Sequence, residues 1–457
     1  MKKKRLSINK QIALSFFLVI FVGSLLLSLT FAQLPTSQAK YIDHLFISVS
    51  SVCVTGLFTQ PIFTSYSLFG QIVILLMIQI GGLGLMTIVS SIMLRAGLRI
   101  KYSDTVAVSE ALNKEGISGF RGFIQSILKY TFILEGIGAL VFMIVMIPEF
   151  GIGRGIFNSI FLAVSAFCNA GFDTWGANSL QTYAFNPLMN IAVTALIILG
   201  GIGFAVWFDV TKNIKSLIKS KMFSPSRLFK KLKVHSRLAL SVTFFVIVIG
   251  TILGLILEGT NPNTWGSYSL WDKFMHSFFH TVTMRTAGFA TVDFTTLSAS
   301  TNFIYILTML IGGSPGGTAG GIKTTTMALV FMLVFVEFRG KRNVNIFKHT
   351  ISTEALRKAT IVFVSFMLMM VFGVIMLLIF DPQIPLLYSL FEVVSALCTV
   401  GVSMNLTPTL SLGSIITLMI LMFTGRIGPM TLLLSFTKQS EGKHVDNQYS
   451  SASILIG

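Results

Sequence analysis

The feature that most constrains the fold of this chain is a glycine-centred segment that occurs four times. The copies read VSSVCVTGLFT (49–59), VSAFCNAGFDT (164–174), TVTMRTAGFAT (281–291) and VSALCTVGVSM (394–404). Spacings of 115, 117 and 113 residues separate their central glycines, which are Gly56, Gly171, Gly288 and Gly401. Such an even period predicts four copies of one structural unit within a single chain.

Each copy has the same surroundings. A long apolar stretch precedes it, at 12–30, 127–147, 238–257 and 359–380. A shorter amphipathic stretch leads into the glycine segment, at 41–53, 156–168, 271–284 and 386–397. A second apolar stretch with its own glycine cluster closes the unit, at 68–94, 187–209, 302–337 and 411–436. Because a bilayer crossing needs about 20 apolar residues, the pattern predicts a unit of helix, half-helix, glycine loop and helix.

Composition indicates a membrane protein. Of the 457 residues, 53% are hydrophobic and 11% are charged, whereas soluble domains carry about 25% charged residues. The first apolar stretch follows MKKKR, as the core of a secretory signal does, and would then be cleaved near Ala32. Its length and the further apolar stretches favour a retained first helix instead.

The basic residues are distributed unevenly. Of the 34 Lys and Arg, 28 fall in the amino terminus, in 95–129, 212–237 and 339–358, and in the tail from Lys438. Because loops rich in Lys and Arg stay in the cytoplasm, both termini and the three basic loops are expected there. The net charge of +17 therefore needs no nucleic acid to explain it.

The loops on the opposite side carry acids. They are Asp43, Glu149, Asp173, Glu258, Asp272, Asp293 and Asp381. Two interpretations stand. Either the acids form an outer mouth that concentrates cations, or they have no such role and are simply tolerated in loops that are exported across the membrane.

The repeated unit predicts a pathway for cations. A half-helix that enters a membrane and turns back leaves non-helical backbone at depth, which is tolerated only when buried in protein or lining a water-filled path. Its carboxyl end carries a partial negative charge, and glycine lets loop carbonyls turn toward one axis in place of water. One unit cannot enclose an axis, so four units around a pseudo-fourfold axis are expected. A carrier for another solute would need inverted repeats, whereas these four repeats run in the same direction. The sequence contains no nucleophile–base arrangement of the kind that enzymes use, so an enzyme is not expected.

On these motifs the chain resembles the Trk/Ktr/HKT superfamily of potassium transport proteins. The most specific parts are RTAGF, the glycine-rich break at 312–321 and GRIGPMT (425–431). With a first helix near residue 12, the chain is more similar to the potassium-translocating membrane subunits of bacterial Ktr systems than to Trk proteins. The resemblance implies an all-α polytopic fold with four M1–P–M2 repeats, eight transmembrane helices and four re-entrant pore helices. The expected divisions are a first repeat 1–94, a linker 95–126, a second repeat 127–211, a linker 212–237, a third repeat 238–338, a linker 339–358, a fourth repeat 359–437 and a tail 438–457.

The resemblance also implies a potassium filter made of backbone carbonyls. Its residues would be Val54, Thr55, Gly56, Asn169, Ala170, Gly171, Thr286, Ala287, Gly288, Thr399, Val400 and Gly401. These segments are degenerate beside the filters of tetrameric potassium channels, so weak discrimination of potassium from sodium is expected. A sodium-coupled or sodium-permeable transporter is the alternative, although glycine in the first segment favours potassium over the sodium-selective plant relatives, which have serine there.

The third closing stretch is predicted to contain a gate. It is broken by Pro315 and by six glycines, Gly312, Gly313, Gly316, Gly317, Gly320 and Gly321. The stretch resembles the phosphate-binding motif G-x-x-x-x-G-K-[ST]. It differs because Ile322 stands between Gly321 and Lys323, and because no strand is predicted before it. By the resemblance, loop 312–322 lies below the filter, obstructs the pore and moves in gating, with Lys323 repelling cations. The alternative is a kinked helix with a packing role.

Arg426 and Arg285 are charges within apolar stretches. Arg426 is expected to face the interior, as an electrostatic barrier or an anchor of the gate loop, and the alternative is a purely structural bond. Arg285 stands where the other units have a cysteine, three residues before the filter glycine. We predict that Glu392, or otherwise Glu135, pairs with Arg285 behind the filter.

The remaining candidates are cysteines and histidines. Cys53, Cys168 and Cys398 are expected to be small buried packing residues rather than metal ligands or disulfides. His276 and His280, four residues apart on the third half-helix, are expected to pack or to face outward rather than to bind zinc.

The resemblance implies partners as well. Potassium is the expected ion, with no organic cofactor on this chain. A homodimer with one pore per protomer is expected in the plasma membrane of a bacterium. A separate cytosolic ring of RCK-type subunits, which bind ATP and ADP, is expected to dock on the basic loops 95–129, 209–238 and 339–358 and to control the gate.

Overall fold

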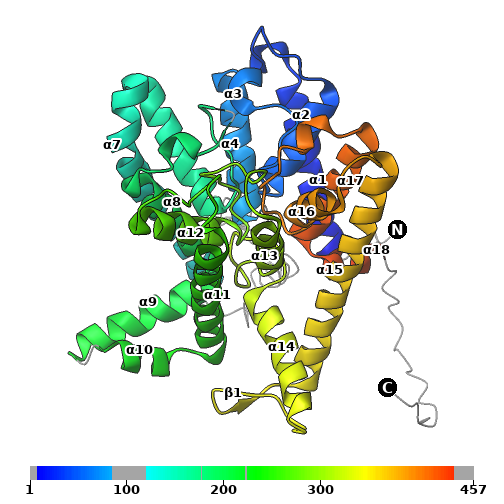
Figure 1. The fold of residues 1–457 in the computed structure, drawn as a ribbon. Coiled ribbons are helices and arrows are strands. Elements are labelled where there is room, and N and C mark those ends of the chain that lie inside the picture. Colours follow the sequence, from blue (N-terminus) through cyan, green and yellow to red (C-terminus); the bar gives the residue numbers. More distant parts are fainter. Residues whose placement is uncertain (1–7, 85–119, 177, 222–223, 437–457) are drawn as a thin grey trace, which may run out of the picture.

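The computed structural model describes residues 8–84, 120–176, 178–221 and 224–436 (Figure 1). These ranges are mainly helical, as the sequence predicts. The β structure in them is one short antiparallel hairpin, in which β1 (Asn345–Ile346) pairs with β2 (His349–Thr350). Short helical turns connect the main helices: η1 (Thr30–Ala32), α3 (Ile62–Ser65), η2 (Gln181–Tyr183) and η3 (Thr407–Thr409).

Four long helices begin the four units. They are α1 (Ile8–Leu27), α7 (Phe120–Cys168), α11 (Val234–Glu258) and α15 (Thr353–Phe380). Within the described residues, these four helices are each long and apolar enough to cross a membrane on their own. They leave large apolar side chains such as Leu140 and Leu368 about two-thirds exposed, at 65% and 66%. Such an outward apolar surface suits lipid contact.

The half-helices follow the long helices. They are α2 (Tyr41–Val52), the last part of α7, α12 (Leu270–Thr283) and α16 (Leu386–Leu397). Helix α7 consists of two helices that meet at Gly151, whose φ of 75° is outside the helical region. The last two turns of α2, α12 and α16 are buried, so each half-helix ends inside the molecule.

The closing helices are interrupted. They are α4 (Leu68–Leu83), α8 (Pro187–Gly201) with α9 (Phe204–Lys219), α13 (Ala299–Leu310) with α14 (Thr324–Phe338), and α17 (Leu412–Ile427) with α18 (Pro429–Phe436). Continuous helices over 187–209 and 411–436 were the expectation, and it is wrong. Gly203 and Gly428 have φ of 94° and 93°, which no helix accommodates, and α9 bends 99° away from α8.

The glycine clusters of the closing helices let them pack closely on the half-helices. A side chain on Gly81, Gly200 or Gly425 would lie 1.8–2.0 Å from a backbone carbonyl oxygen in the last turn of the half-helix of the same unit. These glycines therefore permit close packing of the helices. The second half of the predicted closing stretch 68–94 lies outside the described residues.

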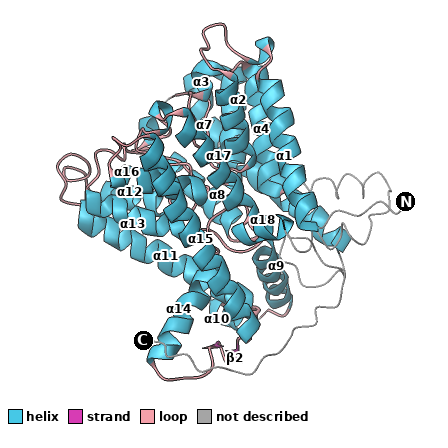
Figure 2. Ribbon diagram, turned by 90° about the vertical axis from the view of Figure 1, so that its right-hand side faces the viewer, coloured by secondary structure: helices cyan, strands magenta, loops and turns pink. Residues whose placement is uncertain are grey.

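The units are arranged in a closed ring. Helix α4 packs on α7, α8 packs on α12, α13 packs on α16, and α17 packs on α2. Each closing helix therefore packs on the helix that carries the half-helix of the next unit, and the last unit returns to the first. Figure 2 shows the helices gathered side by side around this centre.

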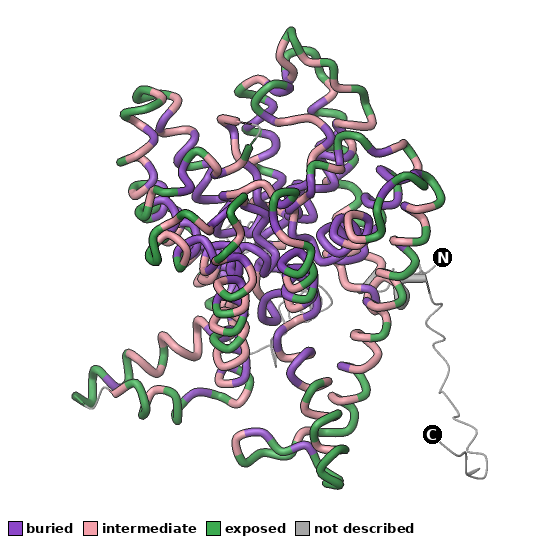
Figure 3. The backbone as a smooth tube through the Cα atoms, in the orientation of Figure 1, coloured by how far each residue is buried: buried purple, intermediate pink, exposed green. Residues whose placement is uncertain are grey.

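Two basic linkers share one end of the molecule. Helix α10 (Pro225–Lys231), α9 and the β hairpin lie together at the lower end of Figures 1 and 2. The Phe229 and Phe347 rings are 5.9 Å apart, and the Arg237 guanidinium lies 5.9 Å from the Phe347 ring. Figure 3 shows many exposed residues at this end and buried residues concentrated in the middle of the molecule. The first basic loop (95–129), apart from its last ten residues, and the tail from Lys438 lie outside the described residues.

Candidate ion pathway

The four glycine segments form a ring at the centre of the molecule. A side chain on Gly56 would lie 2.5 Å from the carbonyl oxygen of Ala170, in the second unit. In the same way, each of the other glycines faces the carbonyl oxygen that precedes the glycine of the following unit. These pairs are Gly171 with Ala287 at 2.7 Å, Gly288 with Val400 at 2.7 Å, and Gly401 with Thr55 at 1.8 Å. The structure thus brings the predicted filter residues of all four units together.

The backbone of the four segments has one shared conformation. Each filter glycine has a positive φ, between 70° and 104°. The residue two positions before it also has a positive φ, although none is glycine: Val54 (56°), Asn169 (61°), Thr286 (70°) and Thr399 (53°). Left-handed residues that alternate with right-handed ones turn successive carbonyls to one side. A β-branched residue in this region is strained, and such strain persists where the surroundings hold it.

The half-helices direct their carboxyl ends at this ring. Helices α2, α12 and α16 end four or five residues before the filter glycines. The carboxyl end of a helix carries about half a negative charge. These ends and the carbonyls therefore make the centre of the ring favourable for a cation.

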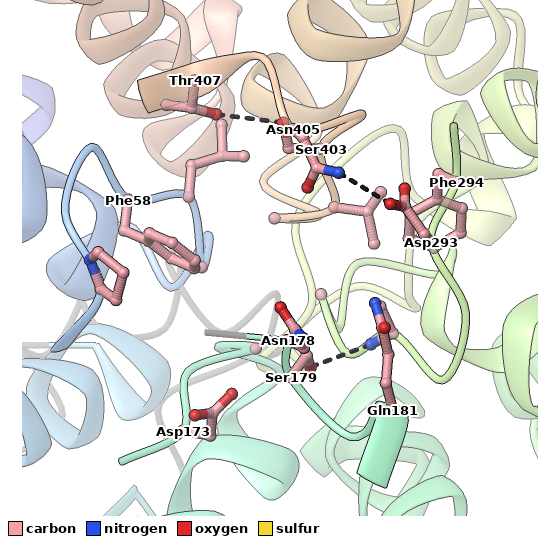
Figure 4. A pocket seen from close by; sticks show the side chains of 18 of the residues that line it. Phe58, Asp173, Asn178, Ser179, Gln181, Asp293, Phe294, Ser403, Asn405 and Thr407 are labelled. Carbon is pink, nitrogen blue, oxygen red and sulfur yellow. Dashed lines mark hydrogen bonds between the residues drawn. The ribbon is translucent and has the colours of Figure 1, made fainter. Parts of the chain in front are cut away.

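One side of the ring opens into a cavity of about 400 Å³ (Figure 4). All four filter glycines line it, as do the carboxyl groups of Asp173 and Asp293. Burial raises the pKa of Asp173 to about 7. Asp293 accepts a hydrogen bond from the Asn405 amide at 3.0 Å. Carboxylates here favour the accumulation of cations.

Other acids of the predicted outer loops have structural roles instead. Glu258 accepts hydrogen bonds from Ser298, the N-cap of α13, and from Thr301. Asp381 accepts from Ser411, the N-cap of α17, at 2.8 Å. Carboxylates stabilise helix N-termini, so Glu258 and Asp381 have a capping role that neither interpretation from the sequence included.

The glycine-rich loop lies on the other side of the ring. Its residue Gly320 donates its N–H to Thr286 Oγ1 at 3.2 Å, and a side chain there would lie 2.0 Å from Thr399 Oγ1. The loop N–H groups of Ser314 and Thr318 donate to backbone carbonyls of the second unit, at 2.8 and 3.2 Å. Because Thr286 and Thr399 precede the filter glycines, the loop and the cavity are on opposite sides of the filter.

Arg426 connects this loop to the rest of the ring. Its guanidinium donates to the carbonyl oxygen of Thr318 in the loop and to those of Gly81 and Gly82 in α4. These are the contacts of an anchor. Lys323, the N-cap of α14, donates to the Ala319 carbonyl oxygen at 2.6 Å, so its amino group also holds the loop.

The predicted ion pair of Arg285 is wrong. Glu392 accepts hydrogen bonds from Ser403 and Thr407, and Glu135 accepts from Gln79 at 3.1 Å. Within the described residues, no carboxylate lies within 4.0 Å of the Arg285 guanidinium, which donates to Thr243 Oγ1 in α11 at 3.3 Å. Each acid is satisfied by neutral groups near it. Arg285 does point away from the axis, toward the opening helix of its own unit.

The three cysteines are buried and free, as predicted. Cys168 Sγ lies 2.5 Å from where a side chain on Gly82 would begin. It therefore fills the space that this glycine leaves.

Three buried serines support the filter and were not predicted. Ser50 and Ser395 accept the N–H groups of Gly56 and Gly401, each at 3.1 Å. Ser165 accepts the N–H of Phe172 at 2.9 Å. A signal was present, because the serine stands six residues before the glycine in three of the four copies. The third copy has valine there.

Comparisons with known proteins place this chain among cation transport proteins. The model of the TrkH family, described as cation transport protein, matches residues 3–446. The chain is 38% identical over 439 residues to the Ktr system potassium uptake protein B of Bacillus subtilis, covering 96% of this chain and 95% of that protein. It is 39% identical over 460 residues to the potassium/sodium uptake protein NtpJ of Enterococcus hirae, covering 100% and 98%.

A solved structure has the same fold. The potassium transporter TrkH from Vibrio parahaemolyticus aligns with a TM-score of 0.75, over 95% of this chain and 86% of that chain. Its sequence identity is 17%, so the likeness concerns the fold alone.

Proposed function

The chain belongs to the TrkH family of cation transport proteins, and from this premise we propose that it takes up potassium through a pore of its own. The observation that carries the proposal is the ring in which each filter glycine faces the preceding carbonyl of the next unit. A ring of carbonyls replaces the hydration shell of an ion that passes along its axis. An inside-negative potential favours entry by about 2.3 kcal/mol per charge per 100 mV.

The proposed architecture is a bacterial plasma-membrane protein with four M1–P–M2 repeats and eight spans. The four long helices supply the first span of each repeat. The closing helices supply the second span of each repeat, and within the described residues each single one of them is shorter than a full crossing. Both termini and the end with α9, α10 and the hairpin then face the cytoplasm, where basic loops remain.

The cavity is the proposed outer entrance. Asp173 and Asp293 collect cations there, and the carbonyl ring accepts them one at a time. The loop on the inner side is the proposed gate, because its contact with Thr286 and Thr399 occupies the ion exit. Arg426 and Lys323 hold the loop in that position, and their charges would oppose a passing cation.

Regulation is proposed to come from a separate subunit. The Bacillus relative is named as part of a Ktr system, and we infer a cytosolic RCK-type ring that binds ATP and ADP. The basic α9–α10 region and the hairpin, which share one end of the molecule, supply its docking surface. A homodimer with one pore per protomer is part of the same proposal.

Sodium transport is the second candidate. The Enterococcus relative is named a potassium/sodium uptake protein, and the four filter segments differ from one another in sequence. Flux measurements with each ion separate the two candidates.

The test is ion flux into liposomes that contain the purified chain. With an inside-negative potential, potassium or rubidium should enter, and sodium should enter more slowly. Gly288→Ala should reduce potassium flux at least about tenfold, because the new methyl group would lie 2.7 Å from the Val400 carbonyl oxygen and the residue has φ of 85°.

The matched control is Gly136→Ala. Gly136 lies in helix α7 and has nothing within 4 Å of an added side chain, so this variant should transport normally. Absence of flux both through the unaltered chain and through a chain whose loop is released by Arg426→Ala, or a normal rate in Gly288→Ala, would overturn the proposal.

A further inference from the structure

Beyond each filter glycine, a hydroxyl group is bonded to a polar side chain from the half-helix of the same unit. In the first unit, Thr59 donates to Oδ1 of Asp43 at 2.6 Å. In the second unit, Thr174 donates to Oδ1 of Asn158 at 2.9 Å. Both threonines stand three residues after the filter glycine, and both partners stand thirteen residues before it.

The third unit makes the same contact with a different partner. Thr291 also stands three residues after its glycine. Its hydroxyl lies 2.8 Å from Nε2 of His280 and 3.2 Å from Nδ1 of His276. One ring can accept the hydroxyl proton while the other donates its N–H to the oxygen. The pair of histidines is thus engaged by Thr291.

The fourth unit also bonds hydroxyl groups to its half-helix, but the residues stand at other positions relative to the glycine. Met404 occupies the place of the threonine. Glu392 on α16 instead accepts hydrogen bonds from Ser403, at 2.9 Å, and from Thr407. Four units therefore bind the chain beyond the glycine to the half-helix, each with a different polar partner. We call these contacts the hydroxyl clamps.

The clamps of the second, third and fourth units are shielded from solvent, whereas the Thr59–Asp43 contact of the first is partly buried. Asn158, His280 and Glu392 are fully buried, and so is Thr174. Apolar residues would fill such positions without the cost of burying polar groups. The recurrence of a hydroxyl contact, despite four different partners, indicates that the bond itself is required.

The clamps fix the chain just after each filter glycine, close to the carbonyl ring. The chain before the glycine contains the strained left-handed residue, and in three units a serine holds the N–H of the filter glycine or of the residue after it. The clamp holds the chain after the glycine. Each carbonyl of the ring therefore lies between the end of a half-helix and a clamp that bonds the chain back to the same half-helix, and this is how a strained backbone is held in one conformation.

We propose that the hydroxyl clamps set the spacing of the carbonyl ring and thereby its preference for potassium over sodium. This inference rests on the proposed function. The clamp residues act through the backbone as positioning residues and do not touch the ion. A ring held at the spacing that suits potassium does not contract around the smaller sodium ion, and loss of a clamp permits that contraction.

The experiment uses Thr59→Val and Thr291→Val in the full chain. Valine has the shape of threonine without the hydroxyl, and Thr→Ser at each site restores it. Potassium and sodium flux into liposomes are measured as functions of concentration. Each Val variant should raise the sodium-to-potassium flux ratio about fivefold and should raise the KM for potassium. The Ser variants should match the unaltered chain.

Thr251→Val is the matched control. Thr251 is buried in α11 and its hydroxyl donates to the Ile247 carbonyl oxygen, so the same chemical change is made away from the filter. If a Val variant fails to fold, Asp43→Asn and Asp43→Leu replace it, since Asn keeps the acceptor oxygen and Leu does not.

The outcomes are separable. A folded Val variant with an unchanged flux ratio and KM overturns the clamp proposal, even if its melting temperature falls. A chain that transports no potassium at all overturns the proposed function instead. A raised ratio in the Val variants, restored in the Ser variants and absent in Thr251→Val, supports the clamps.

Discussion

At the scale of single residues, Arg426 forms hydrogen bonds with residues of two other units. One guanidinium joins the glycine-rich loop of the third unit, which we propose as the gate, to helix α4 of the first unit and to its own helix α17. Hydrogen bonds from charged groups contribute about 1.5–3 kcal/mol each. A single side chain therefore holds the loop against two other units.

Arg426→Ala is expected to increase potassium flux through the purified chain, about tenfold, because the loop loses its anchor. Arg426→Lys, with one compact charge in place of the planar fork, should have a smaller effect. Lys358→Ala is the control, since Lys358 forms an exposed ion pair with Glu354. A lower flux in Arg426→Ala would show that the arginine supports the open pore instead.

Asp173 predicts a dependence on external pH. Burial raises its pKa to about 7, so the carboxyl is charged above that pH and neutral below it. A neutral group attracts fewer cations, and we expect the KM for potassium to rise roughly three- to tenfold as external pH falls from 8 to 5.5. Asp173→Asn should have the high KM at both pH values. An equal pH response in that variant would assign the effect to another group.

For Arg285, the sequence predicts the location of the side chain but not its hydrogen-bond partner. Its burial and its orientation away from the axis follow from its place in the repeat. Its partner does not, because Thr243 is 42 residues away on α11. Whether Glu392 was free to pair depended on Ser403 and Thr407, whose hydroxyls reach it only in the folded chain.

At the scale of elements, the gate loop and the filter are in direct contact. A side chain on Gly321 would place its Cβ 3.5 Å from Cβ of Cys398, within the range of a disulfide. The loop can therefore be fixed in place and released without altering the filter backbone.

Gly321→Cys is expected to form a disulfide with Cys398 under mild oxidation and to lose most of its potassium flux. A reducing agent should restore the flux. Gly321→Ser controls for the strain of a side chain at φ of 65°, and Gly321→Cys with Cys398→Ser controls for the oxidant. A disulfide confirmed by mass spectrometry together with full flux would mean that the loop is not the gate.

Element boundaries were predicted best where one period dominates. The half-helices and opening helices follow their apolar patterns, and the structure places them close to the expected residues. The breaks at Gly203 and Gly428 were missed because one glycine in an apolar stretch is compatible with a helix. At the first break a side chain on residue 203 would lie 2.6 Å from the Pro315 carbonyl oxygen, a tertiary contact that the sequence pattern does not reveal.

At the scale of the whole molecule, the fourfold repeat was predictable and its closure was not. The spacing of four glycines gives the number of units, but the contact of Gly401 with Thr55 crosses almost the whole chain. Closure depends on α17 packing on α2, a contact between the last unit and the first.

A divided chain tests this closure. Cleavage between Lys341 and Arg342, in an exposed turn, separates three units from the fourth. Co-expressed fragments should restore potassium uptake in a transport-deficient strain, because loop tips tolerate breaks. Either fragment alone should not. Uptake by the first fragment alone would show that three units suffice, and an intact chain with Lys341→Ala controls for the changed turn.

The order of the ring has a consequence for biosynthesis. The chain enters the membrane from its amino terminus, and the Thr55 carbonyl meets its partner only after Gly401 has been made. Until then every intermediate lacks one side of the ring. If the ring is the ion pathway we propose, a partly synthesised chain has no complete pathway until translation has passed Gly401.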